Sequence, residues 1–192
     1  MTPPWREALL SLGHNRPGTR FPAGRPNGLV LHSTATPGAT AQQIRDDWQN
    51  NPWVEASAHL AVDDQEALLL IPALQAPARP AEIAWHAGYT ANHRFLGMEL
   101  CEFPEPARAS AAYGRWLDVA GFLCAVWGWD SHLAVFSHRW CSETFHETDH
   151  TDPYPYFTHL GVTWEECLDG VRKAKLKWIE ILTPSATPEV GA

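Results

Sequence analysis

The chain of 192 residues has few charges, and those it has are not concentrated in basic stripes. Charged residues make up 19% of the sequence, and 22 acidic against 14 basic residues give a formal net charge of −8. Proteins that bind nucleic acid rely on Lys and Arg to neutralise phosphates. We therefore expect no nucleic-acid partner.

Long apolar runs are also missing from the sequence. None approaches the roughly 20 residues that cross a bilayer, so we expect no membrane insertion. The first segment, MTPPWREALLSLGHNRPGTRF, has too short an apolar stretch and too many polar breaks for a secretory signal. The chain is thus expected to be made in the cytoplasm, and any export would depend on something other than this segment.

Cysteine is scarce and widely spaced. The four cysteines form no C-x-x-C pair; they are Cys101, Cys124, Cys141 and Cys167. This spacing excludes a thiolate zinc finger and a dense disulfide scaffold. The H-E-x-x-H pattern of many zinc peptidases does not occur either.

Apolar residues make up 45% of the sequence, which is typical of a globular domain. Expected strands alternate with expected helices, which indicates a single α/β domain with a mixed central sheet flanked by helices. We predict strands over 28–34, 57–64, 66–73, 95–103 and 131–139, the second and third forming a hairpin, and helices over 5–13, 39–51, 108–128 and 161–182. Residues 1–26 are expected to form an irregular arm, 27–182 the domain, and 183–192 a linker-like tail.

Two helix starts have clear sequence signals. Thr40 is placed to cap the helix over 39–51, and Thr163 with Glu166 three residues later forms a capping-box pattern.

Two histidines end apolar strands. His32 follows "LVL" and His138 follows "AVFS", whereas His59 opens the hairpin and His86 lies in "AWHAG". Sites of α/β sheets usually form at the carboxyl ends of strands. His32 and His138, with an acid-rich stretch after the second, suggest a catalytic zinc site with three protein ligands and one open position.

The third ligand is expected from the stretch around FHETDHTDPYPYF, residues 145–157. Zinc accepts both imidazole nitrogen and carboxylate oxygen, and chemistry alone does not choose among these candidates. Pro153 weakly favours the residue before it, because proline restricts that residue to extended conformations. The eligible residues are Glu143, His146, Asp149, His150 and Asp152.

Five motifs occur in order: VLHSTAT, SAHLAVD, AWHAG, LGMELCE and SHR…TDHTDPYPYF. Together they resemble the zinc-dependent N-acetylmuramoyl-L-alanine amidases of the type-2 amidase family, which share their fold with peptidoglycan recognition proteins. The resemblance covers roughly 27–160 and implies that Zn²⁺ is bound by His32, His138 and Asp152. It also implies a structural role for Cys141, since the family's third ligand lies further along the loop.

The resemblance extends to catalytic positions. Glu99, in LGMELCE, takes the place of the family's base, and Ala58 replaces a tyrosine of other members, which strengthens the case for Glu99. His150, in H-T-D-P, stands where other members have an oxyanion-stabilising lysine. His86 and Trp85 are expected to contact substrate.

The implied function is a peptidoglycan hydrolase that uses zinc-activated water to cleave the amide between N-acetylmuramic acid and L-alanine. We expect a monomeric endolysin or prophage lytic amidase, released to the cell wall through a holin. The alternatives are a cytoplasmic amidase that recycles wall fragments and a non-catalytic module that binds peptidoglycan.

Overall fold

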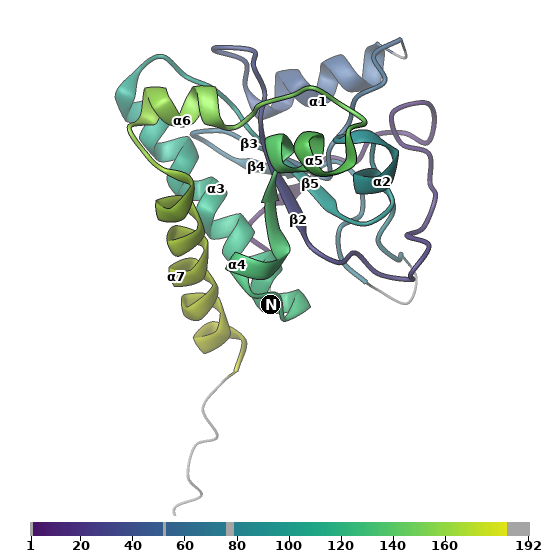
Figure 1. The fold of residues 1–192 in the computed structure, drawn as a ribbon. Helices are drawn as coiled ribbons and strands as arrows, with labels where there is room; N and C mark the ends of the chain where they lie inside the picture. The colour runs from purple at the N-terminus through teal and green to yellow at the C-terminus, as the bar shows by residue number, and fades with distance from the viewer. Residues whose placement is uncertain (1, 52, 76–78, 184–192) are drawn as a thin grey trace, which may run out of the picture.

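The computed structural model describes residues 2–51, 53–75 and 79–183. These residues form one mixed six-stranded sheet in the order β1-β4-β3-β5-β2-β6 (Figure 1). The strands are β1 (Arg6–Glu7), β2 (Leu29–Ser33), β3 (Leu60–Val62), β4 (Ala67–Leu69), β5 (Leu96–Leu100) and β6 (Val135–Ser137). The helices are α1 (Ala41–Asn50), α2 (Gly88–Asn92), α3 (Pro106–Trp127), α4 (Ser131–Ala134), α5 (His138–Phe145), α6 (Tyr154–Leu160) and α7 (Trp164–Leu182). The predicted α/β class with a mixed central sheet is confirmed.

Strand β2 lies inside the sheet, and its residues alternate between the two faces. Leu29 and Leu31 belong to the main core, whereas Val30 joins a smaller cluster with Ala91 and Cys141. His32 shares the face of Val30, because side chains two residues apart in a strand point the same way. The smaller cluster therefore marks the face on which the strand-end histidine lies.

The main core lies on the other face, beneath α3 and α7. These two helices pack against each other (Figure 1), and the buried Trp116 of α3 lies in the same core as Val171 of α7. Gly121 makes this close packing possible, since a Cβ there would lie 2.4 Å from the Cβ of Ala174. The large apolar face of the sheet is thus covered by the long helices, and the face with α2 and α5 is left for the site.

Both helix caps predicted from the sequence are present in the structure. Thr40 caps α1 in a capping box with Gln43, and Thr163 caps α7 in one with Glu166. The predicted hairpin is present as the antiparallel pair β3 and β4, with Asp63 accepting hydrogen bonds from the turn backbone.

The helix predicted over 5–13 is wrong. Residues Arg6 and Glu7 instead form β1, which pairs parallel with β4, and backbone hydrogen bonds continue from Ala8 to Leu69 and from Leu10 to Leu70. An open sheet edge offers unpaired backbone groups, and pairing with them outweighs the weak helical preference of a short segment.

The single strand predicted over 131–139 is also wrong in its extent. Asp130 accepts a hydrogen bond from the backbone of His132 and caps the short α4, so that only Val135–Ser137 form β6. Ser137 then caps α5, whose first residue is His138. The acid-rich loop lies between α5 and α6, and α6 has a proline in its first turn. Of the expected tail, 184–192 lie outside the described residues.

None of the described helices is both long enough and apolar enough to cross a bilayer.

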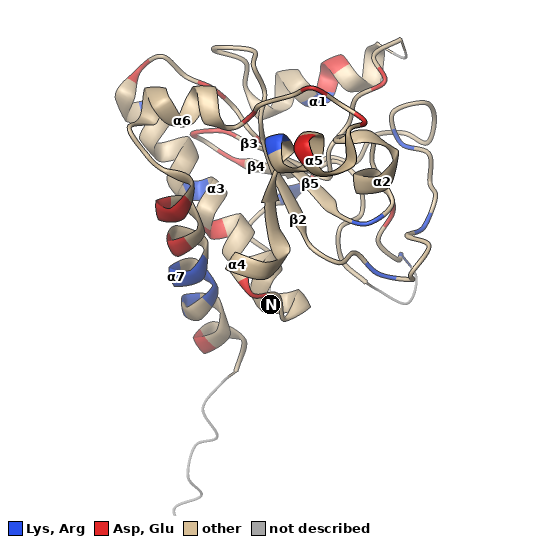
Figure 2. Ribbon diagram, in the orientation of Figure 1, with Lys and Arg blue, Asp and Glu red and all other residues tan. Residues whose placement is uncertain are grey.

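Helix α7 has charges of both signs. Acidic residues lie near its start and basic residues in its middle (Figure 2).

Candidate metal centre

Three side chains meet where β2 and β6 end. His32 lies on β2, His138 opens α5 directly after β6, and Asp152 lies on the loop before α6. Because β2 and β6 are parallel neighbours, their carboxyl ends lie side by side. One ligand atom from each of the three residues lies within 4.8 Å of the others. The structure thus brings together the three residues named by the family resemblance.

The carboxylate of Asp152 lies between the two imidazoles. Its Oδ2 is 3.0 Å from Nδ1 of His32 and its Oδ1 is 3.1 Å from Nδ1 of His138. Burial opposes ionisation of Asp152, but the two rings outweigh this and hold the pKa of its carboxyl well below the usual range. Asp152 is therefore an anion that faces two nitrogen atoms.

The protons on the outer nitrogens can be deduced from their partners. Nε2 of His86 lies 3.0 Å from the carbonyl oxygen of Phe95, which can only accept, so this nitrogen carries the proton. Burial lowers the pKa of His86 well below its usual value, so the ring is neutral and its Nδ1 is an acceptor. His32 therefore donates from Nε2 to Nδ1 of His86, over 3.1 Å.

This arrangement leaves Nδ1 of His32 facing the carboxylate of Asp152. A proton on Nδ1 as well would make His32 a cation, and burial, which lowers the pKa of His32, disfavours that state. A divalent cation held by His32 and Asp152 would remove this conflict. Two imidazoles and one carboxylate form a donor set that zinc accepts, so the residues present fit this metal.

The outer nitrogen of His138 is held as well. Its Nε2 lies 3.2 Å from the hydroxyl of Thr148, which is in turn 2.7 Å from the hydroxyl of Ser142. Such outer contacts fix the orientation of metal-binding imidazoles. Sequence reasoning missed Thr148, because a loop threonine carries no signal of its own.

His86 was expected to contact substrate, but both of its ring nitrogens have protein partners. The ring packs directly over Gly97, where a Cβ would lie 2.6 Å from Cγ of His86. Its backbone N–H donates to Asn92, a residue that sequence reasoning also missed. The ring of His86 lines the cleft, but its two nitrogens are engaged by Phe95 and His32.

Glu99 lies beside His32. Strands β5 and β2 are parallel and pair His32 with Glu99 in register, so both side chains leave the same face. Oε2 of Glu99 is buried and has no hydrogen-bond partner among the described residues. Burial, followed by the nearby charge of Asp152, raises the pKa of Glu99 well above its usual value. An unpartnered carboxyl oxygen next to a metal centre is available to a ligand or to water.

His150 lies at the exposed rim of the centre. Its ring stacks on His138 with centroids 4.5 Å apart, and its Nδ1 is 3.6 Å from Oδ1 of Asp152. This distance is too long for a hydrogen bond, so His150 keeps its donors available.

The other candidate ligands point elsewhere. Glu143 pairs with Arg139, His146 ends α5 in the left-handed region, and Asp149 is exposed. Cys141 is buried in the smaller apolar cluster, and burial raises the pKa of its thiol to about 12, as expected for a structural cysteine.

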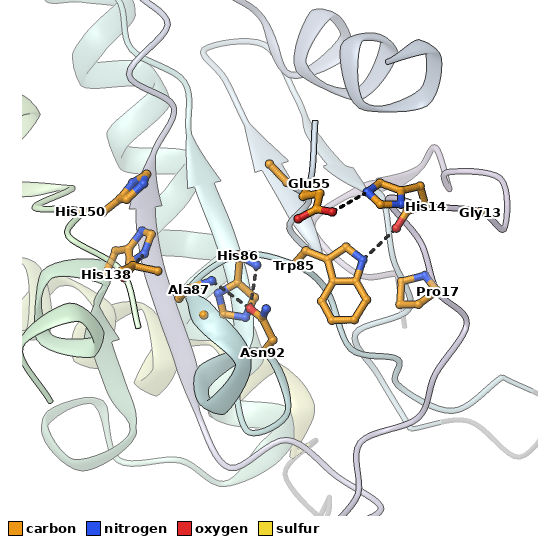
Figure 3. A pocket seen from close by; sticks show the side chains of 13 residues that line it. Gly13, His14, Pro17, Glu55, Trp85, His86, Ala87, Asn92, His138 and His150 are labelled. Atoms are coloured by element: carbon orange, nitrogen blue, oxygen red, sulfur yellow. Dashed lines mark hydrogen bonds and ion pairs between the residues drawn. The ribbon is translucent and has the colours of Figure 1, made fainter. Parts of the chain in front are cut away.

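A cleft of about 710 Å³ extends from the metal centre. His138, Thr148 and His150 line it at the metal end, and His14 and Glu55 line it at the other (Figure 3). His86 and Trp85 lie between the two ends, and contact of Trp85 with substrate stays a prediction. That the N-terminal arm forms part of this wall, through His14, was not predicted from the sequence.

Comparisons with known proteins identify the family of the chain. The family described as N-acetylmuramoyl-L-alanine amidase (Amidase_2) matches residues 22–155. The bifunctional autolysin of Staphylococcus aureus is 24% identical over 160 residues, which are 80% of this chain but 12% of the autolysin. The chain therefore spans only about an eighth of that relative.

Solved structures share the fold. The Staphylococcus aureus hydrolase AmiA, in complex with its ligand, superposes with a TM-score of 0.77 at 22% identity, covering 92% of this chain and 85% of AmiA. A mutant endolysin from Bacillus subtilis gives 0.68 at 23% identity, covering 88% and 99%. The catalytic domain of XlyA gives 0.67 at 24% identity, covering 86% and 97%. Since the family match spans most of the chain and includes all three residues of the candidate metal centre, the chain belongs to the N-acetylmuramoyl-L-alanine amidase family.

Proposed function

We propose that this protein is a zinc-dependent N-acetylmuramoyl-L-alanine amidase that hydrolyses the amide between N-acetylmuramic acid and L-alanine in bacterial peptidoglycan. The observation that carries the proposal is the convergence of His32, His138 and Asp152 within 4.8 Å, beside the unpartnered carboxyl oxygen of Glu99. A non-catalytic binding module would need neither a complete ligand set nor an unpartnered buried carboxyl group.

His32, His138 and Asp152 would hold the zinc ion. Bound there, zinc supplies Lewis acidity, which polarises a carbonyl and makes water more acidic. The protein prepares this site by fixing both imidazoles through their outer nitrogens, His32 on His86 and His138 on Thr148.

Glu99 acts as the general base. Its Oε2 accepts a proton from the attacking water and then delivers it to the nitrogen of the leaving L-alanine. A raised pKa suits this task, because a base works best when its pKa lies near the working pH. The register between β5 and β2 holds the carboxyl group beside the ligand His32.

His150 donates a hydrogen bond to the amide oxygen as negative charge develops on it. The residue lies on the cleft and its nitrogens are not engaged by short hydrogen bonds. A donor that is in place before the reaction stabilises the oxyanion without reorganisation.

We further propose a lytic role like that of endolysins, acting on the cell wall as a monomer. The proposal is supported by the likeness of the fold to the Bacillus subtilis endolysin and by the family shared with the staphylococcal autolysin. Release through a holin belongs to the same proposal.

End-group analysis of digested cell walls tests the amidase activity. Purified peptidoglycan should gain free L-alanine amino termini and no new reducing sugar ends. Chelator should abolish the release and added Zn²⁺ should restore it, while His32→Ala should be inactive under both conditions. New reducing ends without free alanine would assign the protein to glycosidases instead.

A further inference from the structure

The end of the cleft farthest from the metal is built largely by residues that precede the family match. The match begins at residue 22, whereas Gly13, His14 and Pro17 line the cleft. Residues outside the family match therefore contribute to this end of the cleft, and the question is what the wall recognises.

The wall is a firmly anchored turn. Gly13 donates its backbone N–H to the carbonyl of Arg16, which closes the turn with His14 at its tip. The buried side chain of Asn15 donates to the carbonyls of Trp48 and Asn51 at the end of α1. These contacts fix the turn to the domain before any ligand arrives.

A second anchor lies on the other side of the turn. Arg16 makes two hydrogen bonds of 2.9 Å to the carboxylate of Glu82, and both side chains are mostly buried. A bidentate pair of this kind is geometrically specific. The turn is thus a rigid part of the cleft.

The turn also sets the position of Trp85. The indole N–H donates to the carbonyl of His14 over 2.8 Å, and the backbone of Trp85 exchanges hydrogen bonds with Ser57. The ring is half-buried and stands between the metal end and the distal end of the cleft (Figure 3).

The permanent charge at this end is negative. Among the described residues that line the cleft, Glu55 is the single carboxylate, and none of them is Lys or Arg. Its nearest charge partner is His14, at 3.7 Å, and the side chain of Glu55 is 82% exposed. Most of its acceptor capacity is therefore open to a ligand.

We propose that Glu55 and the ring of Trp85 form a distal subsite for a primary ammonium group, which in peptidoglycan is the side-chain amine of the diamino acid in the stem peptide. A carboxylate accepts hydrogen bonds from an ammonium group, and tryptophan is the best aromatic partner for a cation. The anchored turn over 13–17 holds the ring of Trp85 through the carbonyl of His14, and the His14 ring lies 3.7 Å from the carboxylate of Glu55. This inference rests on the proposed function only for the identity of the peptide.

Peptide binding, measured without reference to the metal, tests the subsite directly. The probes are the tripeptide L-alanyl-γ-D-glutamyl-L-lysine and the same peptide acetylated on the lysine side chain, titrated calorimetrically into the whole protein. The free amine should bind roughly tenfold more tightly than the acetylated peptide, as an exposed ion pair and a cation–π contact together provide. Glu55→Gln should reduce this preference to about twofold while leaving the affinity for the acetylated peptide unchanged.

Glu180→Gln, on the exposed face of α7, is the matched control and should keep the full preference. Equal affinity of the wild type for the two peptides, no binding of either one, or an unchanged preference in Glu55→Gln would overturn the subsite. Wall digestion is measured in parallel. A preference for the free amine without wall hydrolysis would overturn the amidase function and leave the subsite standing, whereas hydrolysis without the preference would do the reverse.

Discussion

At the scale of single residues, the site contains a buried carboxyl group that costs stability. Oε2 of Glu99 has no partner among the described residues, and burying a polar group without a hydrogen bond is unfavourable. The proposed role of Glu99 as the general base would explain why the chain retains such a group.

We therefore expect Glu99→Gln to separate activity from stability. The amide cannot accept the proton, so turnover should fall about 10²–10⁴-fold. Zinc content should stay at one ion per chain, since Glu99 is not among the three grouped ligands. Thermal unfolding should occur at the same temperature or higher, because a neutral amide is easier to bury than a carboxylate. Wild-type turnover in this variant would exclude Glu99 as the base.

His150 tests the other half of the mechanism. His150→Ala should lower kcat by about 10²–10³, the usual cost of removing one oxyanion donor. Elemental analysis should still find zinc, because His150 lies at the exposed rim and not among the grouped ligands. His150→Lys should restore part of the rate. Loss of the metal in His150→Ala would show that this residue is a ligand.

At the scale of elements, the packing of the loop before α2 on β5 positions His86 beside the proposed zinc ligand His32. Gly97 of β5 leaves room for the ring of His86, and that ring accepts a hydrogen bond from His32. A Cβ at position 97 would lie 2.6 Å from Cγ of His86, so the ring would have to move.

Gly97→Ala should weaken zinc binding by about tenfold or more, the usual effect of losing an outer partner of a ligand. Competition with a chromogenic chelator measures this affinity. In a His86→Ala background the same change should cost little further, because the ring that clashes is gone. Gly114→Ala is the control, since a Cβ there meets nothing within 4 Å. Additive effects of the two changes would show that Gly97 and His86 act separately.

The sequence predicted those parts of the site that depend on local pattern. His32 and His138 stand out because each ends an apolar strand. The choice of Asp152 depended on the family resemblance, since the helices on either side of its loop, α5 and α6, decide which side chain turns inward. The pairing of Glu99 with His32 is a register between distant strands, which no local pattern contains.

At the scale of the whole molecule, the structure of the N-terminal arm also depends on contacts between distant parts of the chain, so local sequence pattern does not predict it. Residues 6 and 7 form a strand only because β4 offers a free edge, and that edge exists only in the folded sheet. The contribution of His14 to the cleft follows from this pairing together with the anchors at Asn15 and Arg16.

Acid should destabilise the whole domain through His59. This histidine is buried, donates to the carbonyl of Glu82 and accepts from the N–H of Gly97. Burial lowers its pKa from 6.5 to about 4. Between these values the unfolded chain binds the proton and the folded chain does not, so the contribution of His59 is complete above pH 6.5 and is lost as the pH falls towards 4.

The loss should amount to about 3 kcal/mol. It is measured as the difference between the metal-free wild type and His59→Gln in urea unfolding at several pH values between 7 and 4. His59→Gln should be less stable at pH 7 but should lose less stability on acidification. Parallel pH profiles for the two proteins would mean that another group carries the acid sensitivity.

The close approach of His86 to Gly97 also has an evolutionary consequence. A chain that keeps an imidazole at position 86 has no freedom at position 97, whereas a chain with a small residue at 86 regains that freedom. Across related sequences the two positions should therefore change together, and glycine at 97 should disappear first in lineages that have already lost the histidine. Such lineages would be the places to look for descendants whose metal site is decaying.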